Sequence, residues 1–306
     1  MNPVDIAMPP SVSVVVPTRN RPGHIGPCVD SILRQPGNFE LVVVDQSDGD
    51  STERLFAQRA DPRLRYIHSA TRGASTARNI GIGTTRAPII AFTDDDCRVS
   101  PDWLARLLAI FAADPEVAVV FGRVSLPEGA LARGFGAEFQ PQRRVYQHCF
   151  PGPSVPWGIG ANMAVRRSLV ERIGAFDELL GPGAVFPAAE DTDFAIRALS
   201  GGFKIIHAGE VSVLHLGIRE GAEASLLVRG YGVALGAAFA KHLRLGTPGS
   251  ARLLSGWLAS HGSRSIHNAV RGRKPSGFGF VVGLLWGVGR SVRHDVDRAA
   301  HVYANR

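Results

Sequence analysis

The stretch Ala87-Pro88-Ile89-Ile90-Ala91-Phe92-Thr93-Asp94-Asp95-Asp96-Cys97 decides the fold. A short β-branched apolar run between a proline and a polar cluster is typical of a central strand in a parallel sheet. Its three carboxylates would then lie at the carboxyl end of the strand, where open α/β sheets bind ligands. Adjacent carboxylates repel one another unless a cation lies among them, and their hard oxygens favour Mg²⁺ or Mn²⁺ over zinc. The alternative is a solvated acidic turn that caps a helix beginning near Pro101.

Strand-like and helix-like stretches alternate around this run. Strands are expected at residues 12–16, 41–44, 64–67 and 89–92, and helices at 24–34, 51–59 and 74–80. This alternation indicates βαβ units, a parallel sheet and an α/β fold. Right-handed crossovers bring the loops after the strands to one edge, which then carries residues 17–20, 45–48 and 93–96.

The second half of the chain is less regular. We expect a helix at 103–112, a strand at 117–121, a long loop at 129–154 and a helix at 167–173. Glu190-Asp191 opens a further helix that ends at Gly201-Gly202, a typical carboxyl cap. Two short strands, 204–206 and 211–214, lead to His215. We therefore expect a catalytic domain at 1–217 and a helical C-terminal region at 218–306.

Composition indicates an ordinary globular chain of 306 residues, with 45% hydrophobic and 20% charged residues. Three widely spaced cysteines form no Cys-x-x-Cys pair, so neither a disulfide framework nor a zinc site is expected, and a reducing compartment fits best. The first ten residues do not resemble a signal peptide, and no run reaches the roughly 18 to 20 apolar residues of a membrane span. We expect a cytoplasmic protein.

The basic excess lies in the tail. Residues 1–215 carry 21 Lys+Arg against 23 Asp+Glu, whereas residues 216–306 carry 13 against 4, a net charge of +9. Apolar helical segments at 222–242 and 278–292 with flanking arginines suit peripheral contact with an anionic membrane at its inner face, near a lipid-linked acceptor. The alternative is a helical subdomain packed on the catalytic domain. Nucleic acid is not an expected partner, because aromatic residues are not interleaved with the basic ones.

Five motifs in order resemble the family 2 inverting glycosyltransferases. They are Val-Val-Val-Pro-Thr-Arg-Asn ending at Asn20, Val-Val-Val-Asp ending at Asp45, the Gly73–Gly81 segment, the Asp triplet and Glu190-Asp191. The resemblance covers residues 11–217. It implies the GT-A fold, a Rossmann-like mixed and mostly parallel sheet flanked by helices, and a nucleoside-diphosphate sugar donor bound with a divalent metal, Mg²⁺ or Mn²⁺.

The resemblance also assigns the donor side of the site. The donor-binding residues it implies are Pro17, Thr18, Arg19, Asn20, Asp45, Arg78, Asn79, Asp94 and Asp95, with Asp96 and His215 on the metal. The guanidinium of Arg78 can donate two parallel hydrogen bonds to phosphate oxygens. Asp94 would reach the ribose. Asp45 can instead cap a helix, Arg78 can be a surface arginine, and His215 can be merely hydrogen-bonded.

On the acceptor side, the resemblance makes Asp191 the general base. An inverting displacement needs one carboxylate to take the acceptor hydroxyl proton, since a metal-bound diphosphate leaves without a general acid. Glu190, Trp157, Gly160, Ala161 and Asn162 would shape the sugar and acceptor side. The alternatives are that the acids at 190–193 only favour the helix dipole and that Trp157 is a core residue.

Departures from the family pattern limit the prediction. Gln46 and Cys97 stand where many members have further acids, and the Gln-x-x-Arg-Trp motif of processive synthases is absent, because no glutamine follows Gln147. We therefore expect non-processive transfer of one sugar to a hydroxyl acceptor in a cell-envelope glycan or glycolipid. The rival hypotheses are a nucleotidyltransferase and a non-catalytic nucleotide-sugar-binding protein.

Overall fold

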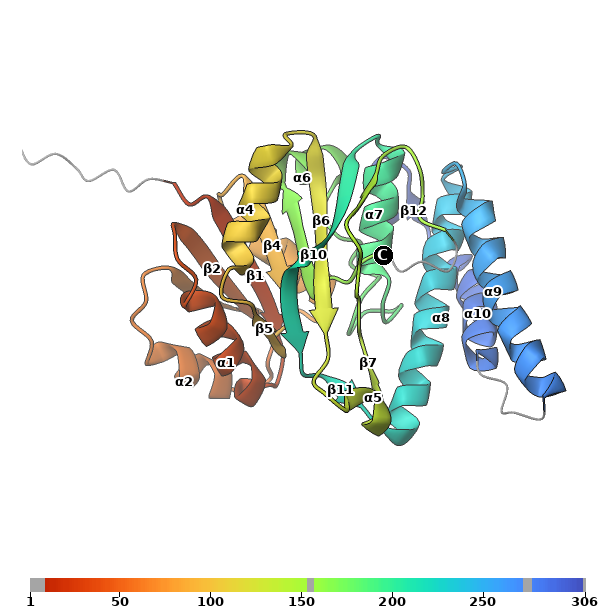
Figure 1. Ribbon diagram of the computed structural model, residues 1–306, viewed down its shortest axis with the longest axis horizontal. Helices are drawn as coiled ribbons and strands as arrows, with labels where there is room; N and C mark the ends of the chain where they lie inside the picture. The colour runs from red at the N-terminus through yellow and green to blue at the C-terminus, as the bar shows by residue number, and fades with distance from the viewer. Residues whose placement is uncertain (1–8, 153–156, 272–276, 305–306) are drawn as a thin grey trace, which may run out of the picture.

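The computed structural model describes residues 9–152, 157–271 and 277–304. Its centre is a nine-stranded sheet in the order β3-β2-β1-β4-β9-β6-β10-β5, with β8 paired to β10 (Figure 1). The strands are β1 Val12–Thr18, β2 Phe39–Asp45, β3 Leu64–His68, β4 Ile89–Thr93, β5 Cys97–Val99, β6 Val117–Ser125, β8 Arg144–Tyr146, β9 Asn162–Arg166 and β10 Lys204–His215. The valine-rich β1 is buried along its whole length, as expected of a central strand covered by helices on both faces.

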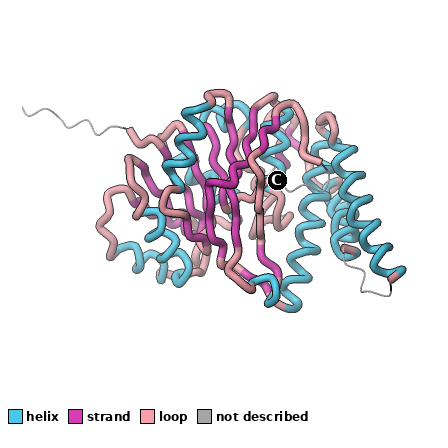
Figure 2. The backbone as a smooth tube through the Cα atoms, in the orientation of Figure 1, coloured by secondary structure: helices cyan, strands magenta, loops and turns pink. Residues whose placement is uncertain are grey.

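The expected mixed, mostly parallel sheet is confirmed. β1 pairs in parallel with both β2 and β4, and β6 pairs in parallel with β10. Helices cover the sheet (Figure 2): α1 Pro22–Leu33, α2 Ser51–Ala57, α3 Ala74–Thr84, α4 Trp103–Ala113, α6 Arg167–Ile173 and α7 Glu190–Ser200. The acidic triplet follows β4, at the carboxyl edge of the parallel strands.

Four expectations about secondary structure need correction. β9 was not expected; it pairs antiparallel with both β4 and β6, and its short apolar run follows a glycine-rich loop that masks it in the sequence. β5 was also missed. β10 is one strand, because an irregularity between Ala208 and Ser212 interrupts its pairing without ending the strand. The expected loop 129–154 contains α5 Ala130–Arg133, β7 Phe135–Gly136 and β8; residues 153 and 154 lie outside the described ranges.

The C-terminal region packs three helices beside the sheet: α8 Gly221–Arg244, α9 Ser250–Val270 and α10 Phe278–Ser291. It also contains short strands β11 Ile218–Arg219, β12 Val296–Asp297 and β13 Val302–Tyr303. Apolar residues of α8 pack with Leu180, Phe186 and Tyr303 in one core cluster. None of the described helices combines the length and apolar character needed to cross a membrane.

Glycines bring α8 and α10 into backbone contact. A Cβ on Gly236 would lie 2.0 Å from the Leu284 carbonyl oxygen, and one on Gly287 would lie 1.9 Å from the Val233 carbonyl oxygen. A Cβ on Gly232 would lie 2.4 Å from the Phe280 carbonyl oxygen, and one on Gly283 would lie 2.5 Å from that of Arg229. Residues that advance along α8 meet residues that advance along α10, so the two helices run parallel. Such Gly-x-x-x-Gly spacing lets two helix backbones approach where larger side chains would separate them.

A buried group of charges joins α8 to α7. Lys241 Nζ lies 2.6 Å from carboxylate oxygens of both Asp177 and Asp193, and Asp193 also pairs with Arg197 at 3.0 Å and His242 at 2.9 Å. Each of these side chains is at most 1% exposed. We call these five residues the Asp193 cluster.

Candidate active site

The acidic triplet meets the first loop of the chain at the sheet edge. The Thr18 hydroxyl donates to Asp95 Oδ2 at 2.7 Å. Arg21 Nη1 lies 3.0 Å from Asp95 Oδ1 and 3.0 Å from Asp96 Oδ2. Burial raises the pKa of Asp95. In this structure a single guanidinium therefore balances two of the three acids.

Asp96 and His215 form a candidate cation site. Asp96 Oδ1 lies 3.3 Å from His215 Nε2, and the two side chains are 7% and 11% exposed. Asp96 Oδ1 and His215 Nδ1 are buried without a hydrogen-bond partner. A buried carboxylate oxygen that accepts no hydrogen bond is unfavourable unless another group satisfies it. Asp96 and His215 therefore fit as ligands of a divalent cation.

Two neighbours refine the cation site. Cys97 Sγ lies with the two ligand atoms within 4.8 Å, but burial raises the pKa of this thiol well above its ordinary value, so it stays protonated and is a poor ligand. Gly217 is a position where a Cβ would lie 2.4 Å from Asp96 Oδ2. Only glycine therefore lets the chain after β10 pass so close to the carboxylate.

Arg78 connects the triplet to the first turn of α7. Its Nη2 donates to Asp94 Oδ1 at 2.9 Å and its Nη1 donates to Glu190 Oε1 at 2.7 Å. Its side chain is 2% exposed. Burial by itself lowers the pKa of Arg78, but Asp94 and Glu190 outweigh it and the net shift is upward, so the guanidinium is always charged. The structure thus shows Arg78 as a buried bridge between two acids and not as a surface arginine.

Asp191 lies in the first turn of α7 and is partly exposed. Its Oδ2 accepts a hydrogen bond from the Gly160 N–H at 2.9 Å, and its Oδ1 accepts from the Thr192 N–H at 2.6 Å. Desolvation, then the neighbouring Glu190 charge, raises the pKa of Asp191 to about 7. A carboxyl held by backbone donors and poised near neutrality suits a general base. Ala189, just before this turn, has a left-handed φ of +70°, which is uncommon outside glycine.

The expected nucleotide residues divide into buried and exposed groups. Asp45 is fully buried and accepts from the hydroxyls of Ser47 and Tyr66. Arg19 and Asn20 instead hydrogen-bond to the exposed Asp48, which the sequence analysis did not single out. Asp45 therefore shapes the loop from within, while Arg19, Asn20 and Asp48 present the polar groups that solvent or a ligand can reach.

Three further predicted residues have structural roles in this conformation. Asn79 clamps the Phe176–Glu178 segment through three hydrogen bonds. Asn162 joins β9 to its neighbours by donating to the Arg123 and Val211 carbonyls and accepting from Trp103 Nε1. Trp157 is 3% exposed and packs against Phe150, so it offers no open face for stacking on a sugar.

Of the remaining predicted positions, only Gly160 contacts Asp191. Gly160 supplies the backbone donor described above, and a Cβ there would lie 3.1 Å from Arg78 Nη2. Ala161 is 1% exposed in the main core cluster. Pro17 is in the buried β1. The sequence analysis also missed Arg21, whose position after a turn gave no sign of its contacts with the triplet.

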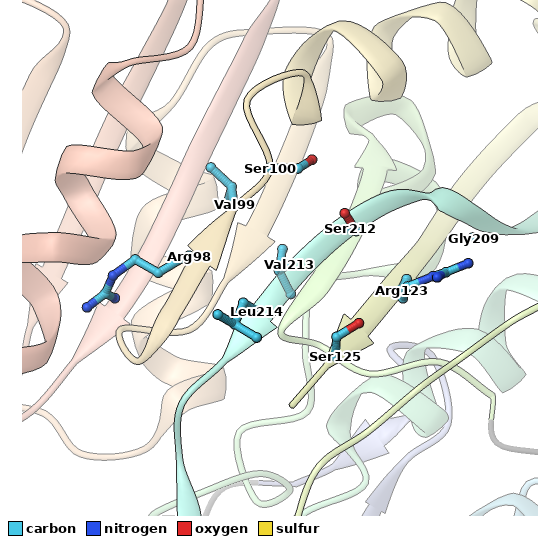
Figure 3. Close-up of a pocket in the computed structure, with 9 residues that line it drawn as sticks. All are labelled: Arg98, Val99, Ser100, Arg123, Ser125, Gly209, Ser212, Val213 and Leu214. Carbon is cyan, nitrogen blue, oxygen red and sulfur yellow. The ribbon is translucent and has the colours of Figure 1, made fainter. Parts of the chain in front are cut away.

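Two cavities lie near the site without containing the triplet. One of about 430 Å³ is lined by residues of β5, β6 and β10, and in Figure 3 the Arg98 side chain points away from Arg123, so the two do not converge on one anion. The other, of about 530 Å³, is lined by Arg219, Glu223, Leu226 and Leu227 at the start of α8. Tyr231, one turn further along α8, is close enough to Asp191, Glu190 and Asp94 for their charges to add to burial in raising its pKa.

The fold defines the class of the protein. Mannosyltransferase PcManGT from Pyrobaculum calidifontis, solved in complex with GDP-Man and Mn²⁺, matches with a TM-score of 0.63 at 21% identity over 94% of this chain and 88% of its own. S. aureus TarS 1-349, solved with UDP, matches with a TM-score of 0.58 at 18% identity over 85% and 74%. At these identities the likeness shows the fold alone, which is the GT-A fold.

Sequence comparison gives the family. The model of glycosyl transferase family 2 matches residues 13–174, more than half of the chain, so the chain belongs to this family. Succinoglycan biosynthesis protein ExoO of Rhizobium meliloti (strain 1021) is 41% identical over 122 residues, 39% of this chain and 35% of its own length. Glycosyltransferase AglE of Haloferax volcanii is 28% identical over 214 residues, 67% of each chain. The match to the first of these relatives thus spans about a third of its length.

Proposed function

We propose that the chain transfers a sugar from a nucleoside-diphosphate sugar to a hydroxyl acceptor by a metal-dependent, inverting and non-processive reaction. The observation that carries this proposal is the placement of Asp191. Its partly exposed carboxyl is held by two backbone donors beside the Arg78 bridge, which leads to the acidic triplet.

The residues divide the chemistry between two ends of the site. Asp191 takes the proton of the acceptor hydroxyl while that oxygen forms the new bond to the anomeric carbon. The bond from the anomeric carbon to the diphosphate breaks with its electron pair on the diphosphate oxygen. Asp96 and His215 would hold Mg²⁺ or Mn²⁺, which stabilises the leaving diphosphate. Because the acceptor attacks opposite to the leaving group in one step, the configuration inverts.

The relatives and neighbours support the choice of substrates to test. Donors with guanosine and uridine diphosphates are suggested by the structures that contain GDP-Man and UDP. Mn²⁺ is suggested by the first of them. A cell-envelope glycan or glycolipid as acceptor is supported by a relative named for succinoglycan biosynthesis. Arg19, Asn20 and Asp48 are the exposed groups proposed to contact the nucleotide.

The test combines donor binding with turnover. The chain is titrated with UDP, GDP and their sugars in the presence of Mn²⁺, and the donor that binds is then used in a transfer assay. We expect Asp191→Asn to reduce turnover about 10³-fold or more while nucleotide binding persists. Full activity in Asp191→Asn would remove it as the base. Tight donor binding by the unmodified chain without turnover on any hydroxyl acceptor would favour a binding protein.

A further inference from the structure

Helix α10 carries a stripe of apolar side chains that are largely exposed to solvent. Phe278, Val282, Leu285 and Trp286 are 61%, 38%, 55% and 51% exposed. Their spacing of four, seven and eight residues places them on one face of the helix. The opposite face is the glycine seam that packs against α8. We call this stripe the α10 face.

Arginines border this face. The Arg229 guanidinium lies 5.0 Å from the centre of the Trp286 ring and that of Arg290 lies 6.0 Å from it. A tryptophan ring with two guanidinium groups over it combines an apolar side chain with adjacent positive charge, which suits the boundary between lipid headgroups and acyl chains.

The segment around the face carries a large excess of positive charge. Between Gly221 and Ser291 the chain has nine Lys+Arg residues and one acidic residue, Glu223. Such an excess attracts an anionic surface and repels a cationic one. A second copy of this chain docked face to face would bring like-charged arginines together around the tryptophans, which disfavours self-association.

We propose that the α10 face docks on an anionic phospholipid bilayer. Phe278, Val282, Leu285 and Trp286 enter the interfacial region, and Arg229 and Arg290 contact lipid phosphates. The helix lies along the surface and does not cross it. The proposal assigns membrane contact to this one face of the protein. Membrane binding here does not depend on sugar transfer.

The position of the face relative to the site adds a substrate consequence, which rests on the proposed function. The exposed Leu226 lies about one turn before Arg229 on α8 and lines the 530 Å³ cavity with Arg219 and Glu223. Tyr231, on the same helix, is close enough to Asp191 for the carboxylate to affect its pKa. A bilayer seated on α10 would thus present a lipid-linked hydroxyl acceptor beside α8, the helix that carries both Leu226 and Tyr231.

The test is co-sedimentation of the full chain with vesicles of phosphatidylcholine alone or of phosphatidylcholine mixed with phosphatidylglycerol. We expect binding to the anionic vesicles that weakens as salt is added. Trp286→Glu should lower the partition coefficient about tenfold or more, since it places a charge at the centre of the face. Arg229→Gln and Arg290→Gln should each lower it about fivefold.

Val145→Glu is the matched control, because Val145 is a similarly exposed apolar residue, 55% accessible, on β8. Val145→Glu should bind vesicles as tightly as the unmodified chain. Val145→Glu and Trp286→Glu should both have the same far-ultraviolet circular dichroism spectrum as the unmodified chain. Equal binding by Trp286→Glu and the unmodified chain, or no binding to anionic vesicles, would overturn the proposal. A dimer in sedimentation velocity that Trp286→Glu dissociates, without vesicle binding, would make the face a protein interface. Vesicle binding by a chain without transferase activity would leave this proposal intact and reject the proposed function.

Discussion

The Asp193 cluster and the Asp96 site contain the same kinds of side chain but pair them differently. Asp193 is fully buried and is contacted by Lys241, Arg197 and His242. Asp96 is nearly as buried, yet one of its oxygens has no hydrogen-bond partner, and neither has a ring nitrogen of His215. Fully paired buried charges hold a fold together, whereas buried charges with vacant bonding positions indicate a ligand.

The largest expected effect comes from breaking the paired cluster. Asp193→Ala leaves Lys241 and Arg197 buried with fewer partners, so the free energy of unfolding should fall by about 3–5 kcal/mol. Urea denaturation followed by circular dichroism measures this. Asp48→Ala is the control, since Asp48 is 60% exposed and its loss should leave the denaturation midpoint nearly unchanged. Equal stability of the two variants would contradict the structural role of the cluster.

The α8–α10 seam should tolerate little added volume. Gly236→Ala forces the two backbones apart and should lower the free energy of unfolding by about 1–3 kcal/mol, which thermal or urea denaturation can measure. Gly289→Ala, on α10 where a Cβ would meet nothing within 4 Å, should instead be neutral or stabilising by up to about 1 kcal/mol. If Gly236→Ala were also stabilising, the close contact would be absent in solution.

Removing a carboxylate from the incompletely paired site should affect ligand binding more than stability. Asp96→Ala should weaken Mn²⁺ binding at least about tenfold, because it removes Asp96 Oδ1, the carboxylate oxygen that has no hydrogen-bond partner. The free energy of unfolding should change little, since the lost repulsion from Asp95 offsets the lost contact with Arg21. Isothermal titration with Mn²⁺ alone tests this without any sugar transfer. An unchanged Mn²⁺ affinity would exclude Asp96 as a ligand.

The smallest expected effect is on the pH dependence of the rate. Asp191 must be ionised to accept a proton, and its pKa is raised to about 7, so kcat/KM should be about fivefold lower at pH 6 than at pH 7. A rate constant measured with one donor and acceptor between pH 5 and 8 shows this. A flat profile over that range would contradict the assignment.

Ionisation of Asp191 should lower the free energy of unfolding, whereas ionisation of Asp193 should raise it. A raised folded-state pKa means that ionised Asp191 disfavours the fold above pH 7, so Asp191→Asn should stabilise the chain at pH 8 and by less at pH 5. Lys241 and Arg197 outweigh burial and hold the pKa of Asp193 well below its ordinary value, so its contribution persists through this range. Urea denaturation of both variants at the two pH values compares them directly.

The helices and strands that have a local sequence pattern could be predicted from the sequence. The valine-rich strands, the helices between them and the triplet at the end of β4 follow from apolar periodicity and position. Asp96 and His215 are brought together as expected, although 118 positions separate them in the chain. The antiparallel β9 was missed because nothing in a five-residue apolar run specifies its two neighbours.

Other features depended on contacts that no local pattern encodes. Asp45, Asn79 and Asn162 are polar residues beside the expected site, but their hydrogen bonds bind loops and strands together. Arg21 is unremarkable until the fold places it against Asp95 and Asp96. The glycines of α8 and α10 lower helix propensity in the sequence, and only the packing of the two helices explains their spacing.

The Arg78 bridge has a consequence for how the enzyme selects its substrates. Because one buried guanidinium holds both Asp94 and Glu190, the spacing of these two carboxylates is fixed in this conformation. If a donor sugar binds between the triplet and α7, as we propose, the two acids would not separate to admit a bulkier ring. Changing their spacing would then require replacing Arg78 itself.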